Sequence, residues 1–380
     1  MAAITDPFRV QLDALAARSR LRRLAPRAGH DFASNDYLGL AHDPVIAAAV
    51  AEAIARGVPI GSGGSRLLRG NAPEHEALEA EAAALFGSAA ALYLANGFAA
   101  NVALLAGLPG PDDLIVADAL IHASAHDGMK LSRASRVLAK HNDPLAFDDA
   151  LAGWRRDGGT GRPWIVVETL YSMDGDKARV DELAEVAGRH DAMLIFDEAH
   201  ATAVHGPGGR GIAAHLEGRE NVIMLHTCGK GLGVEGALVT GPRSIIDLLV
   251  NRGRSFVFST APSPLMAVAV SAALQRMTQA DDLRAQLTAL IDHAAQHLCA
   301  PLDIPPPQSQ ILPVILKDDA RTMAVAATLQ SAGFDVRGIR PPTVPRGTSR
   351  LRVSLTLNVD TAIINDLADV LKQALREDIA

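Results

Sequence analysis

Cysteine, aromatic residues and long apolar runs are all scarce in this chain of 380 residues. The two cysteines, Cys228 and Cys299, are too few for a disulfide framework, which indicates a reducing compartment and predicts a cytoplasmic location. No apolar run approaches the roughly 18–20 residues that a membrane-spanning helix needs, so we expect no membrane partner. Aromatic residues make up 4% of the chain although 48% of it is hydrophobic, so the core is expected to consist mostly of aliphatic side chains.

An excess of positive charge is also missing. The formal net charge is −7 and the pI is near 6.0, which argues against a nucleic-acid partner or an anionic membrane surface. The exception is local, because residues 8–27 carry six arginines on a leucine-spaced pattern. This pattern predicts an amphipathic helix of the mature protein, with a transit peptide as the alternative. Asp6 and Asp13 interrupt the acid-poor character of a transit peptide.

Short aliphatic segments alternate with helix-forming segments through the middle of the chain. The strand candidates are Ala91–Leu94, Leu114–Ala117, Arg136–Ala139, Trp164–Glu168, Met193–Phe196, Val222–Leu225 and Ala237–Thr240. Between them lie alanine-, glutamate- and leucine-rich stretches such as Pro73–Phe86 and Asp181–Arg189. This alternation predicts an α/β fold with a largely parallel sheet covered by helices. Ligands of such sheets bind at the carboxyl ends of the strands, where Glu168, Asp197 and Thr227 fall.

From about residue 265 the pattern changes to that of a smaller α+β module. Its strand and helix candidates are Ile311–Leu316, Arg321–Ala332, Arg350–Leu355 and Thr361–Leu375. We therefore predict a large domain over residues 41–264 and a small C-terminal domain over residues 265–380. An N-terminal helix and segment over residues 1–40 is expected to join the small domain.

Two neighbouring strand candidates end in residues that suit one cofactor. Met193–Phe196 is followed by Asp197, and His200 comes three residues later. The next strand leads into Thr227 and then Lys230, which is flanked by glycines. A carboxylate that can hold a pyridinium nitrogen and a lysine that can form a Schiff base are what pyridoxal phosphate requires of a protein. Asp197 could alternatively be a helix cap and Lys230 a surface lysine, but their joint occurrence favours the cofactor site.

Three other kinds of site share parts of these motifs. Asp197–His200 spells the Walker B box of an ATPase, but the upstream phosphate loop that such an enzyme needs is absent. Gly231–Gly236 matches G-x-G-x-x-G, yet a strand follows it where a dinucleotide fingerprint needs a helix. His122 and His126 have the spacing of a zinc helix, but Ala123 stands where the glutamate belongs, so we expect no metal site.

Motifs along nearly the whole chain resemble those of the α-oxoamine synthases. They are Ser34–Leu40, Gly61–Arg66, Asn96–Asn101, Ser172–Asp176, Asp197–His200, Thr227–Lys230 and Ile339–Pro345. Members of this family are pyridoxal-phosphate enzymes of fold type I, which condense an amino acid with an acyl-CoA and release CO2. The resemblance implies a large domain with a mostly parallel sheet flanked by helices and a smaller C-terminal α+β domain.

The resemblance also implies roles for individual residues. Lys230 would be the Schiff-base lysine and Asp197 the partner of the pyridine nitrogen. The other implied contacts with the cofactor are His200 and Ser172 near its phenolic oxygen, His122 stacked on its ring, and Gly97, Phe98 and Thr227 at its phosphate. Ser259 and Thr260 match a segment that reaches the phosphate of a neighbouring subunit, which implies a homodimer.

The substrates follow from the same resemblance. Arg352 would bind the carboxylate of the amino acid, with Asn35 close by, and Thr343 belongs to the substrate-binding set. Arg22 is the preferred partner for a distal carboxylate on the acyl chain. Together the motifs are most similar to those of family members that join L-alanine to a pimeloyl thioester, carried by CoA or acyl-carrier protein, in biotin biosynthesis. The alternatives are enzymes using glycine or serine, of the 2-amino-3-ketobutyrate CoA ligase, 5-aminolevulinate synthase or serine palmitoyltransferase type, and a non-catalytic protein that keeps the fold.

Overall fold

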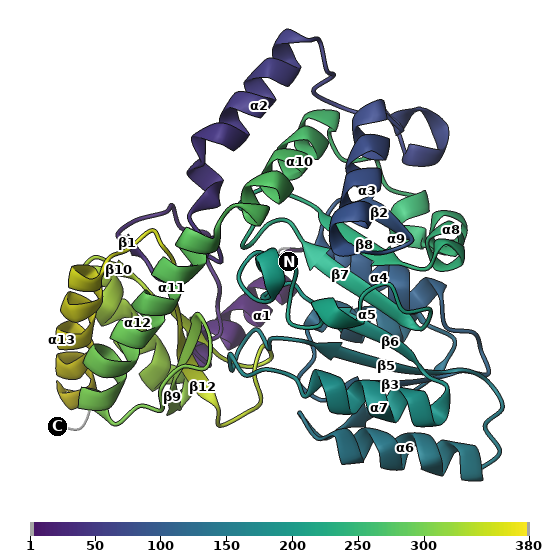
Figure 1. The fold of residues 1–380 in the computed structure, drawn as a ribbon. Coiled ribbons are helices and arrows are strands. Elements are labelled where there is room, and N and C mark those ends of the chain that lie inside the picture. Colours follow the sequence, from purple (N-terminus) through teal and green to yellow (C-terminus); the bar gives the residue numbers. More distant parts are fainter. Residues whose placement is uncertain (1–3, 378–380) are drawn as a thin grey trace. The chain divides into compact units, whose positions relative to one another are not determined.

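A computed structural model describes residues 4–377, and Figure 1 shows its fold. The chain forms two compact units. The large unit consists of Leu38–Ser172 and Asp176–Arg284, and the small unit of Met1–Tyr37, Met173–Gly175 and Ala285–Ala380. The boundary expected near residue 265 lies before the observed one, which falls between Arg284 and Ala285. Helix α10 (Pro264–Thr278) belongs to the large unit because it packs against α2 (Pro44–Ala55) and α3 (Pro73–Phe86).

A seven-stranded sheet forms the centre of the large unit (Figure 1). In spatial order its strands are β2 (Ala90–Leu94), β8 (Ala237–Gly241), β7 (Val222–Thr227), β6 (Met193–Asp197), β5 (Pro163–Glu168), β3 (Leu114–Asp118) and β4 (Ser135–Ala139). Only β8 runs antiparallel to its neighbours. The seven strand candidates and the mostly parallel sheet are therefore confirmed, with element ends differing by one or two residues.

Six of the seven strands are buried at every residue, which explains why they read as continuous apolar runs, whereas the edge strand β4 is exposed at four of its five residues. Successive side chains point to opposite faces, so Ile115 and Ala117 pack in one apolar cluster while Leu114 and Val116 pack in another. The helices that connect the strands supply the other half of each cluster. They are α4 (Gly97–Gly107), α5 (Ala123–Leu131), α8 (Arg243–Arg252) and α9 (Arg254–Val257) on the first face, with α6 (Pro144–Arg156) and α7 (Val180–His190) on the second.

The small unit is an α+β module, as the sequence predicts. Strands β11 (Arg337–Ile339), β12 (Ser349–Ser354) and β9 (Ile311–Lys317) form an antiparallel sheet. Its apolar core lies between this sheet and the helices α12 (Asp319–Ser331) and α13 (Thr361–Glu377), together with the later part of α11 (Asp281–Ala294). The short strand β1 (His30–Asp31) pairs with β10 (Phe334–Asp335), which ties the N-terminal segment to this unit.

The N-terminal helix is shorter than the arginine pattern suggests. Helix α1 spans Asp6–Ala17, and Ser19 adopts a left-handed conformation with φ 54° just beyond it. The arginines after Ala17 are therefore not helical, and Arg20 pairs instead with Asp319 at 2.8 Å. None of the residues of α1 is buried, and Phe8, at 65% exposure, is the largest of its exposed apolar side chains.

Among residues 4–377, no helix combines the length and the apolar character that crossing a membrane requires.

Candidate active site

The carboxyl edge of the large sheet brings together polar side chains from three adjacent strands. Glu168 ends β5, Asp197 ends β6 and Thr227 ends β7. Glu168 and Asp197 are paired in register across the two parallel strands. All three side chains are buried, although they stand at the end of their strands. Buried polar groups at this edge are typical of a ligand site in an α/β fold.

Asp197 is held by two hydrogen-bond donors. Asn101 on α4 donates through Nδ2 to Asp197 Oδ2 at 2.8 Å, and the backbone N–H of Ala199 donates to Oδ1 at 2.9 Å. These two donors fix the orientation of the buried carboxylate. A carboxylate in this position suits a cationic partner such as a pyridinium N–H.

The same asparagine continues to His122. Asn101 Nδ2 also donates to the hydroxyl of Ser124 at 3.0 Å, and that hydroxyl lies 2.7 Å from His122 Nδ1. The backbone N–H of Ser124 donates to His122 Nδ1 at 3.2 Å, so Nδ1 acts as an acceptor and the ring carries its proton on Nε2. Asp197 and His122 are therefore oriented by one network, which starts from the buried side chain of Asn101.

Lys230 and His200 meet after the ends of β7 and β6. Lys230 Nζ lies 2.9 Å from His200 Nε2. The loop is fixed nearby by Thr227, whose hydroxyl donates to the carbonyl of Ala199 at 3.2 Å. A lysine amine beside an imidazole nitrogen has a neighbour with which it can share a proton.

Glu168 is a buried acid to which the sequence assigned no role. The backbone N–H of Ser172 donates to its Oε2 at 3.1 Å, and its Oε1 is buried with no hydrogen-bond partner among the described residues. Burial, followed by the negative charge of Asp197, raises the pKa of Glu168 to about 8. At neutral pH its side chain is therefore mostly the uncharged acid.

A helix start and a bare backbone lie beside Thr227. Helix α4 begins at Gly97, and Asn96 caps it by accepting a hydrogen bond from the N–H of Ala99 at 2.8 Å. A Cβ on Gly97 would lie 2.5 Å from Thr227 Cγ2, so a side chain at this position would collide with the threonine. Free N–H groups at a helix start, a glycine and a hydroxyl form a suitable cradle for a phosphate.

These features of the large unit fit pyridoxal phosphate. Asp197 can hold the ring nitrogen, Lys230 can bond the aldehyde carbon, and the start of α4 with Thr227 can receive the phosphate. The raised pKa of Glu168 leaves Asp197 as the acid available to the ring nitrogen. Ser259 and Thr260 follow α9 and are exposed, as is Phe98 at 49%, so these three residues present their side chains to the outside of the described chain.

The amino-acid-binding residues expected from the sequence meet in the small unit. Arg352 on β12 is 7% exposed, and its Nη2 donates to Asn35 Oδ1 at 3.0 Å. The hydroxyl of Tyr37 donates to the same oxygen at 3.0 Å, and Arg352 Nη1 donates to the Ser354 hydroxyl at 2.8 Å. Asn35 and Ser354 thus hold the guanidinium in place, and the positive charge of an arginine side chain suits a carboxylate.

The second expected pair in the small unit is also brought together. Arg22 Nη2 donates to the Thr343 hydroxyl at 3.2 Å. Arg340, which is 8% exposed, donates to the carbonyl of Leu21 at 3.0 Å, and its Nε is buried without a hydrogen-bond partner in the described structure. Burial and then the charge of Arg22 lower the pKa of Arg340 below its usual value. Arg22 and Arg340 therefore concentrate positive charge here. The acid nearby is Asp319, which pairs with Arg20.

Sequence reasoning assigned no function to Asn101, Ser124, Glu168 and Arg340. Asn101 and Arg340 belong to motifs that carry the family resemblance, and Glu168 stands at a strand end, so position and motif membership were the available signals. Their roles depend on partners 23 to 319 positions away along the chain.

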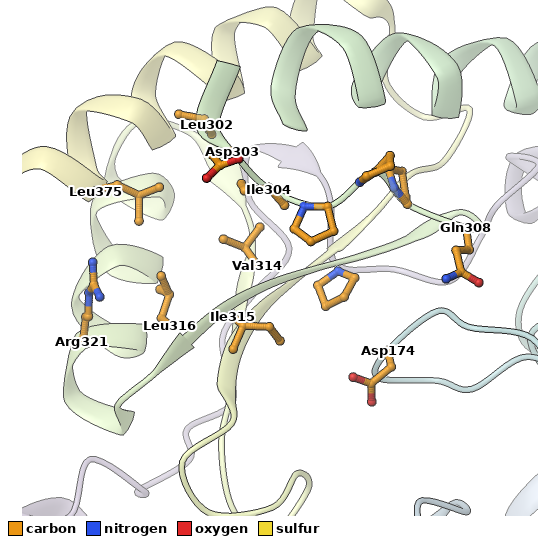
Figure 2. Close-up of a pocket in the computed structure, with 14 residues that line it drawn as sticks. Asp174, Leu302, Asp303, Ile304, Gln308, Val314, Ile315, Leu316, Arg321 and Leu375 are labelled. Carbon is orange, nitrogen blue, oxygen red and sulfur yellow. The ribbon is translucent and has the colours of Figure 1, made fainter. Parts of the chain in front are cut away.

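A pocket of about 500 Å³ lies elsewhere in the small unit (Figure 2). Its walls are largely apolar and include Pro305, Pro306 and Val314, while Arg321 and Asp174 lie on opposite sides of it in this view. None of the residues expected to bind cofactor or substrate lines it.

Comparison with known proteins agrees with this geometry. The model of the family "Aminotransferase class I and II" matches residues 29–371. The chain is 43% identical to an 8-amino-7-oxononanoate synthase of Anaeromyxobacter dehalogenans strain 2CP-1, covering 97% of this chain and 96% of the relative. It is 39% identical to a protein of the same name from Azoarcus sp. strain BH72, covering 98% of each chain.

Solved structures share the fold. A serine palmitoyltransferase of Sphingomonas wittichii matches with a TM-score of 0.87 at 26% identity, covering 100% of this chain and 98% of that one. An 8-amino-7-oxononanoate synthase of Francisella tularensis matches with a TM-score of 0.76 at 26% identity, covering 93% and 99%. Fold type I and the resemblance to the α-oxoamine synthases are therefore confirmed. The chain belongs to the aminotransferase class I and II family and, within it, to the group of the 8-amino-7-oxononanoate synthases.

Proposed function

We propose that this protein uses pyridoxal phosphate to condense L-alanine with a pimeloyl thioester, releasing 8-amino-7-oxononanoate, CO2 and the free thiol carrier. The observation that carries the proposal is the 39–43% identity, over nearly the full length, to proteins named 8-amino-7-oxononanoate synthase. Asp197 ends β6 and Lys230 follows the neighbouring strand β7, and this placement supports the cofactor chemistry independently. When bound, pyridoxal phosphate supplies an electron sink for the charge left on the α-carbon of alanine.

Lys230 and His200 carry the proton chemistry in this proposal. A lysine that has released the cofactor can take the α-proton of alanine only as the neutral amine. His200 Nε2 lies 2.9 Å from Lys230 Nζ and can accept its surplus proton. Lys230 returns a proton to the product carbon after CO2 has left, so one amine serves both transfers.

Asp197 holds the proton on the ring nitrogen. Its two donors, Asn101 and Ala199, orient the carboxylate. A negative charge within hydrogen-bond reach shifts the pKa of its partner by about 1–3 units. The ring nitrogen therefore stays protonated during the step that needs electron withdrawal.

Arg352 is proposed to bind the carboxylate of alanine. Its guanidinium can make two parallel hydrogen bonds to a carboxylate, and its contacts with Asn35 and Ser354 fix the plane of the fork. Holding the carboxylate also orients the α-carbon, which determines which bond faces the base.

Arg22, with Thr343 and Arg340, is proposed to recognise the distal carboxylate of the pimeloyl chain. Replacing Arg22 with alanine should raise the KM for pimeloyl-CoA about 10- to 100-fold, since a hydrogen bond to a charged group contributes about 1.5–3 kcal/mol. Heptanoyl-CoA lacks the distal carboxylate and should respond little to the substitution. Arg23→Ala, at an exposed neighbouring arginine, is the matched control. Equal losses with both thioesters would contradict the role of Arg22.

A homodimer is proposed on the basis of exposed apolar side chains. Phe98 and Phe258 are 49% and 73% exposed, Phe258 directly precedes the segment Ser259–Thr260, and α1 has no buried residue. Exposed apolar groups of this kind often mark an interface. Light scattering of the purified protein should give twice the chain mass of 39.8 kDa. A cytoplasmic location stays a prediction from the low cysteine content.

A substrate panel tests the proposal directly. Release of CoA is measured for alanine, glycine and serine, each combined with pimeloyl-, acetyl-, succinyl- and palmitoyl-CoA. We expect the highest kcat/KM for alanine with pimeloyl-CoA. One methyl group in a pocket is worth about 1–3 kcal/mol, so the preference over glycine should be about 10- to 200-fold. A clear preference for glycine or serine would assign the protein to another α-oxoamine synthase activity.

A further inference from the structure

His141 lies between two aspartates just after the edge strand β4. Its Nδ1 is 2.8 Å from Asp118 Oδ1, and its Nε2 is 3.1 Å from Asp176 Oδ2. A carboxylate accepts hydrogen bonds and does not donate them, so both ring nitrogens act as donors here. The ring is therefore an imidazolium that bridges two acids. In His122, by contrast, Nδ1 accepts a hydrogen bond.

The surroundings of His141 favour this charged form. Asp118 at the end of β3 and Asp176 in the segment after β5 face it, and the ring of Tyr171 packs edge-on with a centroid distance of 4.5 Å. The neighbouring Lys140 points elsewhere and pairs with Asp143. Burial lowers the pKa of His141, but the hydrogen bonds and charges of the two aspartates outweigh burial and raise the pKa to about 10.

Asp176 belongs to a short hairpin that begins where β5 ends. Leu170 forms an antiparallel bridge with Lys177, and the N–H of Tyr171 donates to the carbonyl of Asp176 at 3.0 Å. Ser172 follows Tyr171 on this hairpin, and its N–H donates to Glu168. The hairpin therefore carries Ser172, which is expected to contact the cofactor. The backbone N–H of the same residue donates to Glu168, the buried acid beside Asp197.

His141 and Asn142 attach this hairpin to the rest of the sheet edge. Asn142 Nδ2 donates to Asp176 Oδ2 and to the carbonyl of Lys177, both at 2.9 Å. The N–H of Asn142 donates to Asp118 Oδ2 at 2.8 Å, so the turn after β4 is itself fixed to β3. One turn thus connects the end of β3 to the hairpin that follows β5.

We propose that His141 is a positioning residue, whose charged ring ties Asp176 to Asp118 and thereby fixes the hairpin that places Ser172 and the Ser172–Glu168 hydrogen bond. The proposal rests on the proposed function, because it assigns Ser172 and Glu168 to the cofactor site. His141 itself touches neither Lys230 nor Asp197 through any hydrogen bond in the described structure. Its effect on the reaction is transmitted through the hairpin.

The test compares His141→Gln with the wild type in the cofactor-bound protein. Glutamine has both of its N–H donors on one nitrogen, so it cannot place a donor at each of the two separate positions that Nδ1 and Nε2 occupy, and its carbonyl oxygen can only accept. Amide hydrogen exchange over residues 169–178 should become at least tenfold faster, while exchange in α7 should change less than twofold. The apparent Kd for pyridoxal phosphate should rise at least fivefold and kcat should fall, whereas the KM for alanine should change less than twofold. Unchanged exchange in the hairpin, or equal acceleration throughout the large unit, would overturn the proposal.

His190→Gln is the matched control, because His190 also pairs with an aspartate, Asp148, at 2.8 Å in the large unit. It should leave hairpin exchange and cofactor affinity unchanged. Should His141→Gln fail to fold, the proton signals of His141 in the wild-type protein provide the second measurement. They should not titrate between pH 6 and 8.5, and a midpoint in that range would refute the bridging imidazolium. Exchange and titration are measured without turnover, so failure of the condensation assay is distinguishable from failure of this proposal.

Discussion

At the scale of single residues, the candidate site separates two acids that the sheet places side by side. Glu168 and Asp197 are paired in register, and two buried carboxylates in this position would repel each other. Asp197 has the amide of Asn101 and a backbone N–H as donors, whereas one oxygen of Glu168 has no partner in the described structure. Asp197 therefore has the donors that a buried carboxylate needs, and it is the acid that we propose for the pyridine nitrogen.

The charge of Asp197, more than its shape, should determine the rate. Asp197→Asn keeps the size of the side chain and removes the charge that holds the ring proton. We expect kcat for CoA release to fall about 10- to 1000-fold, corresponding to the 1–3 pKa units that a neighbouring charge commonly provides. The visible absorbance of the bound cofactor should persist, since Lys230 is intact. A rate within threefold of the wild type would mean that another group holds the ring nitrogen.

At the scale of elements, the junctions between strands and helices decide where ligands can approach. Helix α4 begins at a glycine because the neighbouring Thr227 leaves no room for a Cβ. The same junction leaves the first N–H groups of the helix without partners inside the helix. Local backbone geometry thus creates the proposed phosphate cradle before any side chain contributes to it.

Gly97→Ala should therefore weaken cofactor binding. The added Cβ would lie 2.5 Å from Thr227 Cγ2, so either Thr227 or the start of α4 must shift. We expect the Kd for pyridoxal phosphate, measured by its absorbance on titration, to rise at least tenfold. Gly188→Ala is the control, because Gly188 lies exposed in α7 and a Cβ there meets nothing within 4 Å. That control should leave cofactor binding unchanged and stabilise the helix by about 0.5–1 kcal/mol.

At the scale of the whole molecule, the titrations of buried Glu168 and half-buried His141 give the free energy of unfolding a common dependence on pH. The pKa of Glu168 rises from 4.5 to about 8 on folding, mainly through burial, and the pKa of His141 rises from 6.5 to about 10 through its two aspartates, against the effect of burial. In both cases the folded state holds a proton that the unfolded chain releases. The stabilisation is fully present below the unfolded pKa and is lost as pH rises through the folded pKa.

We therefore expect the unfolding free energy of the cofactor-free protein to fall between about pH 5 and pH 10. The unfolding free energy should change by about 1.4 kcal/mol per pH unit for each group that differs in protonation between the two states. The contribution of His141 should be smaller, because its partial exposure lets solvent screen its charge. Urea unfolding at pH 5, 7 and 9 measures it. Glu168→Gln should flatten the lower part of the curve and His141→Gln the upper part. A stability that rises from pH 5 to pH 9 would show that neither proton is held on folding.

The fold was predictable because its signals are local. The seven strand candidates follow from short, mostly apolar segments, and six of the seven strands are buried, so little alternation obscured them. The division into units was less predictable, because α10 joins the large unit through its packing against α2 and α3. The length of α1 was overestimated because the arginine pattern continues beyond Ala17 while the helix does not.

The sequence by itself determined where the strands lie along the chain, which residues stand at their carboxyl ends and which motifs identify the family. Lys230 and Asp197 are recognisable because each follows a short apolar run, a property of neighbouring residues alone. Only the tertiary structure decided which acid stays uncharged, that Asn101 orients both Asp197 and His122, and that His141 bridges two aspartates. These properties depend on burial and on partners from distant parts of the chain, which come together only when the sheet has formed.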